Sequence, residues 1–125
     1  MAKDKLASDI LKVSERDIKK TCGEFLSALQ NMKRLIFLRL NSGDILTGEG
    51  EAKRLVRCCP AGTSDSIVIL PKSRGVIFVE YKSKKGKQSR DQLAFEKKVT
   101  EQGHEYWLVS DYDAFNEAIA EVLRQ

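Results

Sequence analysis

The sequence predicts a mixed α/β fold in which a mixed β-sheet is flanked by helices. Two apolar runs of strand length, at 67–70 and 76–81, are joined by a short polar connection that begins with Pro and ends with Gly, a pattern typical of a hairpin between antiparallel strands. A helical pattern and a third apolar run at 104–110 follow. A strand, a helix and a strand in succession imply a right-handed crossover and a parallel pair. The sheet should therefore contain both kinds of pairing.

The length and composition favour one domain. The chain has 125 residues, and we expect a single domain over 1–125 with residues 1–8 as a candidate loose terminus. No apolar segment reaches the roughly 18 residues that cross a bilayer, and residues 1–5 lack a signal-peptide core. We therefore expect an intracellular, cytoplasmic protein without a membrane partner. The three cysteines lack metal-site spacing and are expected to be reduced thiols.

A first helix is predicted over 14–32. Apolar residues recur there at helical spacing, and Ser14 can cap the free backbone amides. Glu15 continues the apolar stripe toward the helix start. A carboxylate in the first turn can simply stabilise the helix dipole, but its alignment with the buried stripe favours an inward orientation toward a site.

The next segment gives a strand and an ambiguous region. Residues 35–40 predict a strand, and the Asn, Gly and Asp in 41–44 supply a turn. Residues 48–62 mix Gly, Pro and charge around a short apolar piece, Leu55-Val56. Two interpretations stay open for this region: a strand with a long loop, or a flap.

The predicted hairpin places two acids together. Antiparallel pairing brings the end of the second strand back to the start of the first, so Asp65 and Glu80 become neighbours. Alternation along the second strand puts Phe78, Glu80 and Lys82 on one face. The plainer alternatives are a turn residue at Asp65 and an exposed ion pair between Glu80 and Lys82.

The last part of the chain predicts a helix, a strand and a helix. Ser89-x-x-Gln92 has the form of a capping box, and Gly103 follows the helix that it opens. The strand at 104–110 comes next, and Ser110 can cap a final helix. The stripe of that helix is Tyr112, Phe115, Ile119 and Val122 or Leu123. The predicted order of elements is α-β-β-β-α-β-α.

These residue types suit the hydrolysis of a phosphodiester. The reaction needs a nucleophilic water and neutralisation of the charge that builds on the phosphoryl oxygens, and Mg²⁺ bound by one or two carboxylates supplies much of this. Asp65 and Glu80 are the expected ligands, and the backbone carbonyl of Tyr81 is a further one. Lys82 can position or deprotonate the water, provided that its pKa falls.

Basic residues are unevenly distributed, although the net charge is only +4. One run follows Lys82 and a second precedes the hairpin, and we expect both to lie beside the carboxylates and to bind nucleic acid. The alternative for either run is a solvated loop. The expected contacts are Lys53, Arg54 and Arg57 in one group, and Lys84, Lys85, Lys87 and Arg90 in the other.

Together these motifs resemble the virus-type replication-repair nuclease family, VRR-NUC, within the PD-(D/E)XK superfamily. The matching pieces are Ser14-Glu15, Arg39-Leu40-Asn41-Ser42-Gly43, Gly62-Thr63-Ser64-Asp65, Glu80-Tyr81-Lys82 and Ser89-x-x-Gln92. They span most of the chain. The family usually has Pro before the first Asp, where this chain has Ser64, but the carboxylate itself is kept.

The resemblance implies a restriction-endonuclease-like core, dependence on Mg²⁺ or Mn²⁺, and hydrolysis of DNA. It implies Asp65 and Glu80 as ligands, Glu15 as an accessory acid, Lys82 as the catalytic amine and Gln92 as an organising residue. Glu49 or Glu51 is the alternative accessory acid. Stand-alone members of this size resemble phage-encoded enzymes, and their similarity to Holliday junction resolvases implies a homodimer acting on branched DNA.

Two alternative functions stay open. One is a nuclease of linear duplex or single-stranded DNA. The other is a non-catalytic nucleic-acid-binding module with the same fold, against which the intact Asp65, Glu80 and Lys82 argue. Shape-dependent recognition of DNA is expected, because contacts to phosphate carry little sequence information.

Overall fold

The centre of the molecule is a four-stranded sheet with the order β1-β4-β5-β6. The computed structural model describes residues 13–125, so the candidate loose terminus at 1–8 lies outside the described residues. The strands are β1 (Ile36–Arg39), β4 (Ser66–Ile69), β5 (Val76–Tyr81) and β6 (Glu105–Val109). The first three are antiparallel and β5 and β6 are parallel. The mixed sheet predicted from the sequence is confirmed, and so is each predicted pairing.

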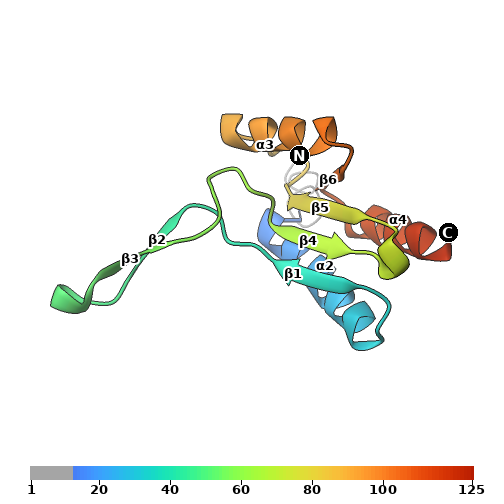
Figure 1. Ribbon diagram of the computed structural model, residues 1–125, viewed down its shortest axis with the longest axis horizontal. Helices are drawn as coiled ribbons and strands as arrows, with labels where there is room; N and C mark the ends of the chain where they lie inside the picture. Colours follow the sequence, from blue (N-terminus) through green and yellow to red (C-terminus); the bar gives the residue numbers. More distant parts are fainter. Residues whose placement is uncertain (1–12) are drawn as a thin grey trace, which may run out of the picture.

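Helices cover both faces of this sheet (Figure 1). They are α2 (Glu15–Asn31), α3 (Arg90–Glu101) and α4 (Tyr112–Arg124). Side chains of α2 and α4 such as Leu26 and Ile119 share one buried cluster with alternate residues of the strands, such as Val79. On the opposite face, the ring of Phe95 in α3 packs edge-on against Phe78 at 5.5 Å. This gives the expected mixed sheet flanked by helices.

The helix starts depend on side-chain caps. Ser14 accepts a hydrogen bond from the amide of Asp17, as predicted, and Ser89 forms a complete capping box with Gln92. The prediction that Ser110 caps α4 is wrong. Asp111 is the N-cap, and its Oδ1 accepts a hydrogen bond from the amide of Asp113 at 3.0 Å. Both residue types cap helices well, so the sequence alone could not separate these adjacent positions.

No helix in the part of the chain that the structure describes is both long enough and apolar enough to cross a membrane.

A two-stranded arm emerges between β1 and β4. We define the arm as residues 44–57, which contain β2 (Asp44–Thr47), the short helix η1 (Gly50–Ala52) and β3 (Arg54–Arg57). Its two strands pair only with each other, and the arm projects away from the main sheet (Figure 1). The predicted order lacked both of its strands. The region that the sequence left as a strand with a long loop, or a flap, is a hairpin.

Candidate metal centre

Asp65 and Glu80 lie side by side because β4 and β5 form the predicted hairpin. The register pairs Ser66 with Val79. Asp65, which precedes Ser66, therefore lies opposite Glu80, which follows Val79. The backbone amide of Asp65 donates to Oε2 of Glu80 at 3.2 Å, and the backbone amide of Tyr81 donates to Oδ2 of Asp65 at 2.8 Å. Each carboxylate is therefore held by a main-chain donor from the neighbouring strand.

A close approach of backbone to backbone brings the start of α3 to this pair. Gly62 has a φ of +89°, and a Cβ at this position would lie 2.3 Å from the carbonyl oxygen of Asp91. Only glycine fits there. Ser64 is buried and donates from its hydroxyl to the carbonyl of Ser66 at 3.1 Å. Its polar group is thus satisfied within the turn.

Gln92 uses both ends of its side-chain amide. Its Oε1 accepts a hydrogen bond from the amide of Ser89 at 2.8 Å, which completes the capping box. Its Nε2 donates to Oε1 of Glu80 at 2.9 Å. The predicted role in the helix cap and a contact to the carboxylate are therefore combined in one side chain.

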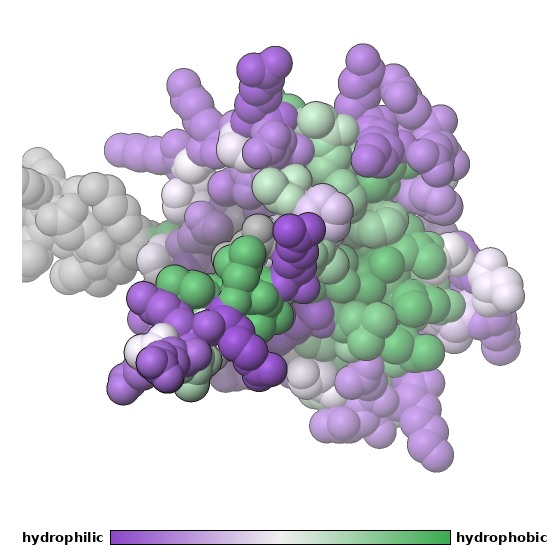
Figure 2. Space-filling view, turned by 60° about the vertical axis from the view of Figure 1, so that its left-hand side comes forward, coloured by the Kyte–Doolittle hydropathy of each residue, from purple (hydrophilic) through white to green (hydrophobic). Residues whose placement is uncertain are grey.

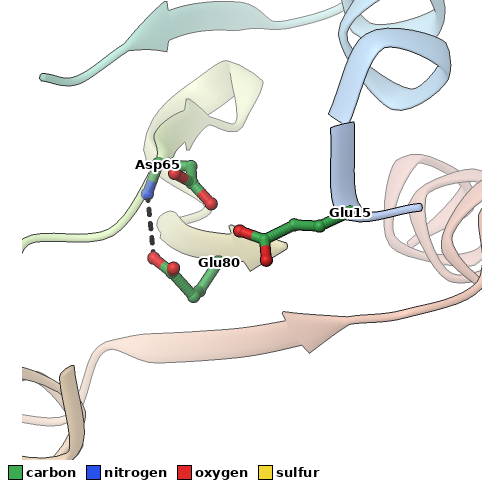
Figure 3. A group of neighbouring side chains, drawn as sticks. All are labelled: Glu15, Asp65 and Glu80. Atoms are coloured by element: carbon green, nitrogen blue, oxygen red, sulfur yellow. Dashed lines mark hydrogen bonds between the residues drawn. The ribbon is translucent and has the colours of Figure 1, made fainter. Parts of the chain in front are cut away.

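Glu15 completes a group of three carboxylates (Figure 3). It lies in the first turn of α2 and reaches toward Asp65 and Glu80, and one oxygen of each residue lies within 4.8 Å of the others. Glu49 and Glu51, the alternative accessory acids, lie instead at the tip of the arm and are exposed. Glu15 is thus the third acid that the fold brings to this pair.

The electrostatics follow from burial and crowding. Glu80 is only 2% exposed. Burial first, and then the charge of Asp65, raise the pKa of Glu80 to about 7. The charge of Glu15 adds to this effect, whereas Lys82 and the hydrogen bond from the Asp65 amide oppose it. The buried position and the neighbouring carboxylates therefore favour the protonated form of Glu80.

Lys19 is a site residue that the sequence interpretation missed. Its Nζ lies 3.2 Å from Oδ1 of Asp65, and its side chain is half exposed. A lysine on an amphipathic helix is ordinarily assigned to the solvent side. The available signal was its position four residues after Glu15, which places both on the same face of α2.

Lys82 follows the last residue of β5 and is partly buried. Its backbone amide donates to the carbonyl of Val109 at 2.9 Å, so the chain is fixed to β6 at this point. Its charge lowers the pKa of Glu80, in opposition to the burial. Lys82 thus lies within electrostatic range of the carboxylates.

The two basic groups occupy different places. Lys84, Lys85, Lys87 and Arg90 are exposed in the loop from β5 to α3 and at the start of that helix, next to Lys82. Lys53 and Arg54 lie near the tip of the arm, which projects from the sheet (Figure 1). Arg57 lies at the base of the arm. The expectation that both groups lie beside the carboxylates is therefore wrong for Lys53 and Arg54, because their strand belongs to a separate hairpin.

The donor set fits a hard divalent cation. Carboxylate oxygens are the ligands that Mg²⁺ and Mn²⁺ prefer, whereas Zn²⁺ sites use histidine and cysteine. The three carboxylates come from the residue before β4, from β5 and from the first turn of α2, so their spacing depends on the fold and not on one flexible loop. Clusters of exposed acids occur in many proteins, and in this one Glu15 is exposed, Asp65 is partly buried and Glu80 is buried.

The chain matches no protein-family model and no curated protein. Its function is therefore inferred from the geometry of this site and from the chemistry of its side chains.

Proposed function

We propose that the protein is a metal-dependent, structure-selective DNA endonuclease that hydrolyses phosphodiesters. The observation that carries the proposal is the convergence of Glu15, Asp65 and Glu80 within 4.8 Å, with Lys19 and Lys82 beside them. Acids that hold a cation and amines that face the scissile phosphate are what this reaction requires. Branched DNA, such as a Holliday junction, is the proposed substrate.

The proposed ligands are Asp65, Glu80 and the backbone carbonyl of Tyr81, with Glu15 as an accessory acid. A divalent cation held by these groups, Mg²⁺ or Mn²⁺, would supply the neutralisation of phosphoryl charge that hydrolysis requires. Main-chain donors fix Asp65 and Glu80 in advance of any ligand. Such preorganisation removes a cost of reorganisation at the moment of reaction.

The remaining polar and basic side chains of the site have separate proposed roles. Lys82 positions or deprotonates the attacking water and stabilises developing negative charge. Gln92 organises the site by holding Glu80. Lys84, Lys85, Lys87 and Arg90 contact the DNA backbone, so binding should weaken with added salt. Because contacts to phosphate carry no sequence information, shape decides the substrate.

We also propose that the protein acts as a homodimer. Two copies related by a two-fold axis present one site to each of two strands, which is the geometry of symmetric junction cleavage. A nuclease of linear duplex or single strands is the alternative enzyme, and a non-catalytic nucleic-acid-binding module is the alternative outside catalysis.

The test is a panel of labelled substrates incubated with Mg²⁺, with Mn²⁺ and with EDTA. We expect cleavage of a four-way junction that requires the metal and that falls at least ~100-fold in Asp65→Asn and Lys82→Met protein. Lys20→Met, which removes an exposed lysine of α2, is the matched control and should remain active. Undiminished cleavage by either variant would contradict the assignment of that residue to the catalytic site. A protein that shifts the junction in a gel but never nicks it would be the non-catalytic module.

A further inference from the structure

A glycine in the middle of α2 makes room for an arginine of the sheet. Gly23 is buried and its backbone is helical, so its conformation does not require glycine, which is a poor helix former. A Cβ built at this position would lie 3.1 Å from Nη2 of Arg39 and 3.9 Å from Cζ of the same guanidinium. The missing side chain at Gly23 therefore allows the guanidinium of Arg39 to pack directly against the helix.

Arg39 lies at the end of β1 that adjoins the carboxylates. It pairs with Ser66, the residue after Asp65, and the amide of Leu40 donates to the carbonyl of Asp65 at 2.8 Å. Ser66 also pairs with Val79, whose side chain belongs to the core beneath α2. Because cross-strand partners share a face, Arg39 points to the α2 side of the sheet. Its side chain thus crosses from β1 to α2 close to the first acid of the site.

One side of α2 leads from the acids to this arginine. Glu15, Lys19 and Gly23 are spaced four residues apart and lie along the same side of the helix. Glu15 approaches the two other acids, and Nζ of Lys19 lies 3.2 Å from Oδ1 of Asp65. The guanidinium at Gly23 comes about one turn later, or about 6 Å along the helix axis. A second cation therefore follows Lys19 on the side of α2 that faces the site.

The guanidinium of Arg39 is open to an anion. Arg39 is exposed, and the ion pairs formed among residues 13–125 do not include it. In the view of Figure 2, many hydrophilic side chains extend away from the body, whereas the end of the Arg39 side chain lies against α2. A guanidinium carries a planar set of donors that matches phosphate, and little entropy is lost when its position is already fixed. Its chemistry and its position suit an oxyanion beside the carboxylates.

We infer that Arg39, packed against Gly23, binds a backbone phosphate of the nucleic acid next to the phosphodiester that is cut. The inference rests on the proposed function, because it requires nucleic acid at this site. The sheet order places Arg39 on β1, Asp65 before β4 and Lys82 after β5, so the two cations flank the acids. A nucleic-acid backbone that runs along this edge of the sheet meets a cation on each side of the carboxylates.

The test measures binding in EDTA, where no metal-dependent cleavage occurs, by fluorescence anisotropy of a labelled four-way junction. We expect Arg39→Met to weaken binding about five- to tenfold, and to lower the slope of log affinity against log salt by about 1. Arg34→Met is the matched control, because it removes an exposed arginine that precedes the other end of β1. Equal weakening by the two variants would overturn the inference, since net charge alone would then explain it.

Gly23→Ala gives a sharper test because it changes no charge. Alanine is the better helix former, so the variant should melt no lower than wild type. Its Cβ should nevertheless displace the guanidinium and weaken binding about two- to threefold. In Arg39→Met protein the same substitution should have no further effect on binding. Unchanged binding by Gly23→Ala, or a loss that persists in Arg39→Met protein, would overturn the inference.

The two proposals fail in different ways. Wild-type protein that binds the junction but never cuts it with Mg²⁺ would overturn the endonuclease, whereas selective weakening by Arg39→Met would still support the phosphate contact. Cleavage that requires Mg²⁺, together with wild-type affinity in Arg39→Met protein, would overturn the phosphate contact alone. Wild-type protein that binds no junction would overturn both.

Discussion

Nε2 of Gln92 lies 2.9 Å from Oε1 of Glu80, and this single hydrogen bond links the start of a helix to a buried acid. The other end of the same amide completes the cap of α3 through the amide of Ser89. The helix start therefore fixes the rotamer of Gln92, and Gln92 in turn orients Glu80. A preorganised carboxylate of this kind needs its supporting residues as much as its own position.

Removal of this side chain should damage both stability and activity. Gln92→Ala loses half of the capping box and a donor to a buried acid, so we expect the free energy of unfolding to fall by about 1–2 kcal/mol and junction cleavage to fall with it. Ser89→Ala is the control, because it removes the cap bond to the Gln92 amide but leaves the donor to Glu80 in place. Urea denaturation and cleavage rates are measured on both. If Gln92→Ala and Ser89→Ala lose activity equally, Gln92 acts only through the helix cap and not through its hydrogen bond to Glu80.

Lys19 should compete with a cation for Asp65. Because its Nζ lies 3.2 Å from Oδ1 of Asp65, Lys19→Met should tighten Mg²⁺ binding about two- to fivefold, the scale of a half-exposed ion pair. The measurement is the Mg²⁺ dependence of the melting temperature. Lys20→Met has the same change in net charge on the same helix. If both variants shift the Mg²⁺ midpoint equally, the effect is one of net charge alone.

Without metal, stability should fall as the pH rises from about 4.5 to about 7. Below this range Glu80 is protonated in both states, and within it the unfolded chain ionises while the folded protein keeps the proton. Above the range Glu80 is ionised in the folded and in the unfolded state. The loss of stability is then complete and amounts to about 1.4 kcal/mol for each unit by which folding raises the pKa of Glu80. Urea denaturation in EDTA should show a flatter pH dependence for Glu80→Gln than for wild type. Identical slopes would contradict the raised pKa.

Gly62→Ala should be far more costly than Gly43→Ala. Both glycines have positive φ, but a Cβ at Gly62 would meet the backbone of Asp91, whereas nothing lies within 4 Å of one at Gly43. We expect about 1 kcal/mol of strain at Gly43 and about 3 kcal/mol or more at Gly62, since the start of α3 must move. Thermal melts compare the two variants. Similar costs would show that the close approach is unimportant.

Much of the sheet could be predicted because its signals are local. The hairpin of β4 and β5 has two apolar runs and a short connection, which fixed the pairing of Asp65 with Glu80. Capping motifs located the starts of α2 and α3. The place of Glu15 on the apolar stripe predicted that it faces the two acids, and it does lie beside them, but its side chain is exposed and not buried.

The arm and Lys19 were missed for physical reasons. Each strand of the arm has only four residues, and its apolar side chains occupy both faces, so no alternation marks a buried side. Glycines at 48 and 50 interrupt the pattern further. The partner of Lys19 lies 46 positions away in the chain. No local pattern contains such a pair.

The neck of the arm is closed by its own hydrogen bonds. Leu40 donates to the carbonyl of Asp65 at 2.8 Å, and Gly43 donates to the carbonyl of Cys59 at the same distance. These hydrogen bonds therefore hold together the two points at which the chain leaves the main sheet and returns to it. Peptides of other lengths could be grafted between Gly43 and Cys58 without displacing the first acid of the site, because closure entropy grows slowly with loop length.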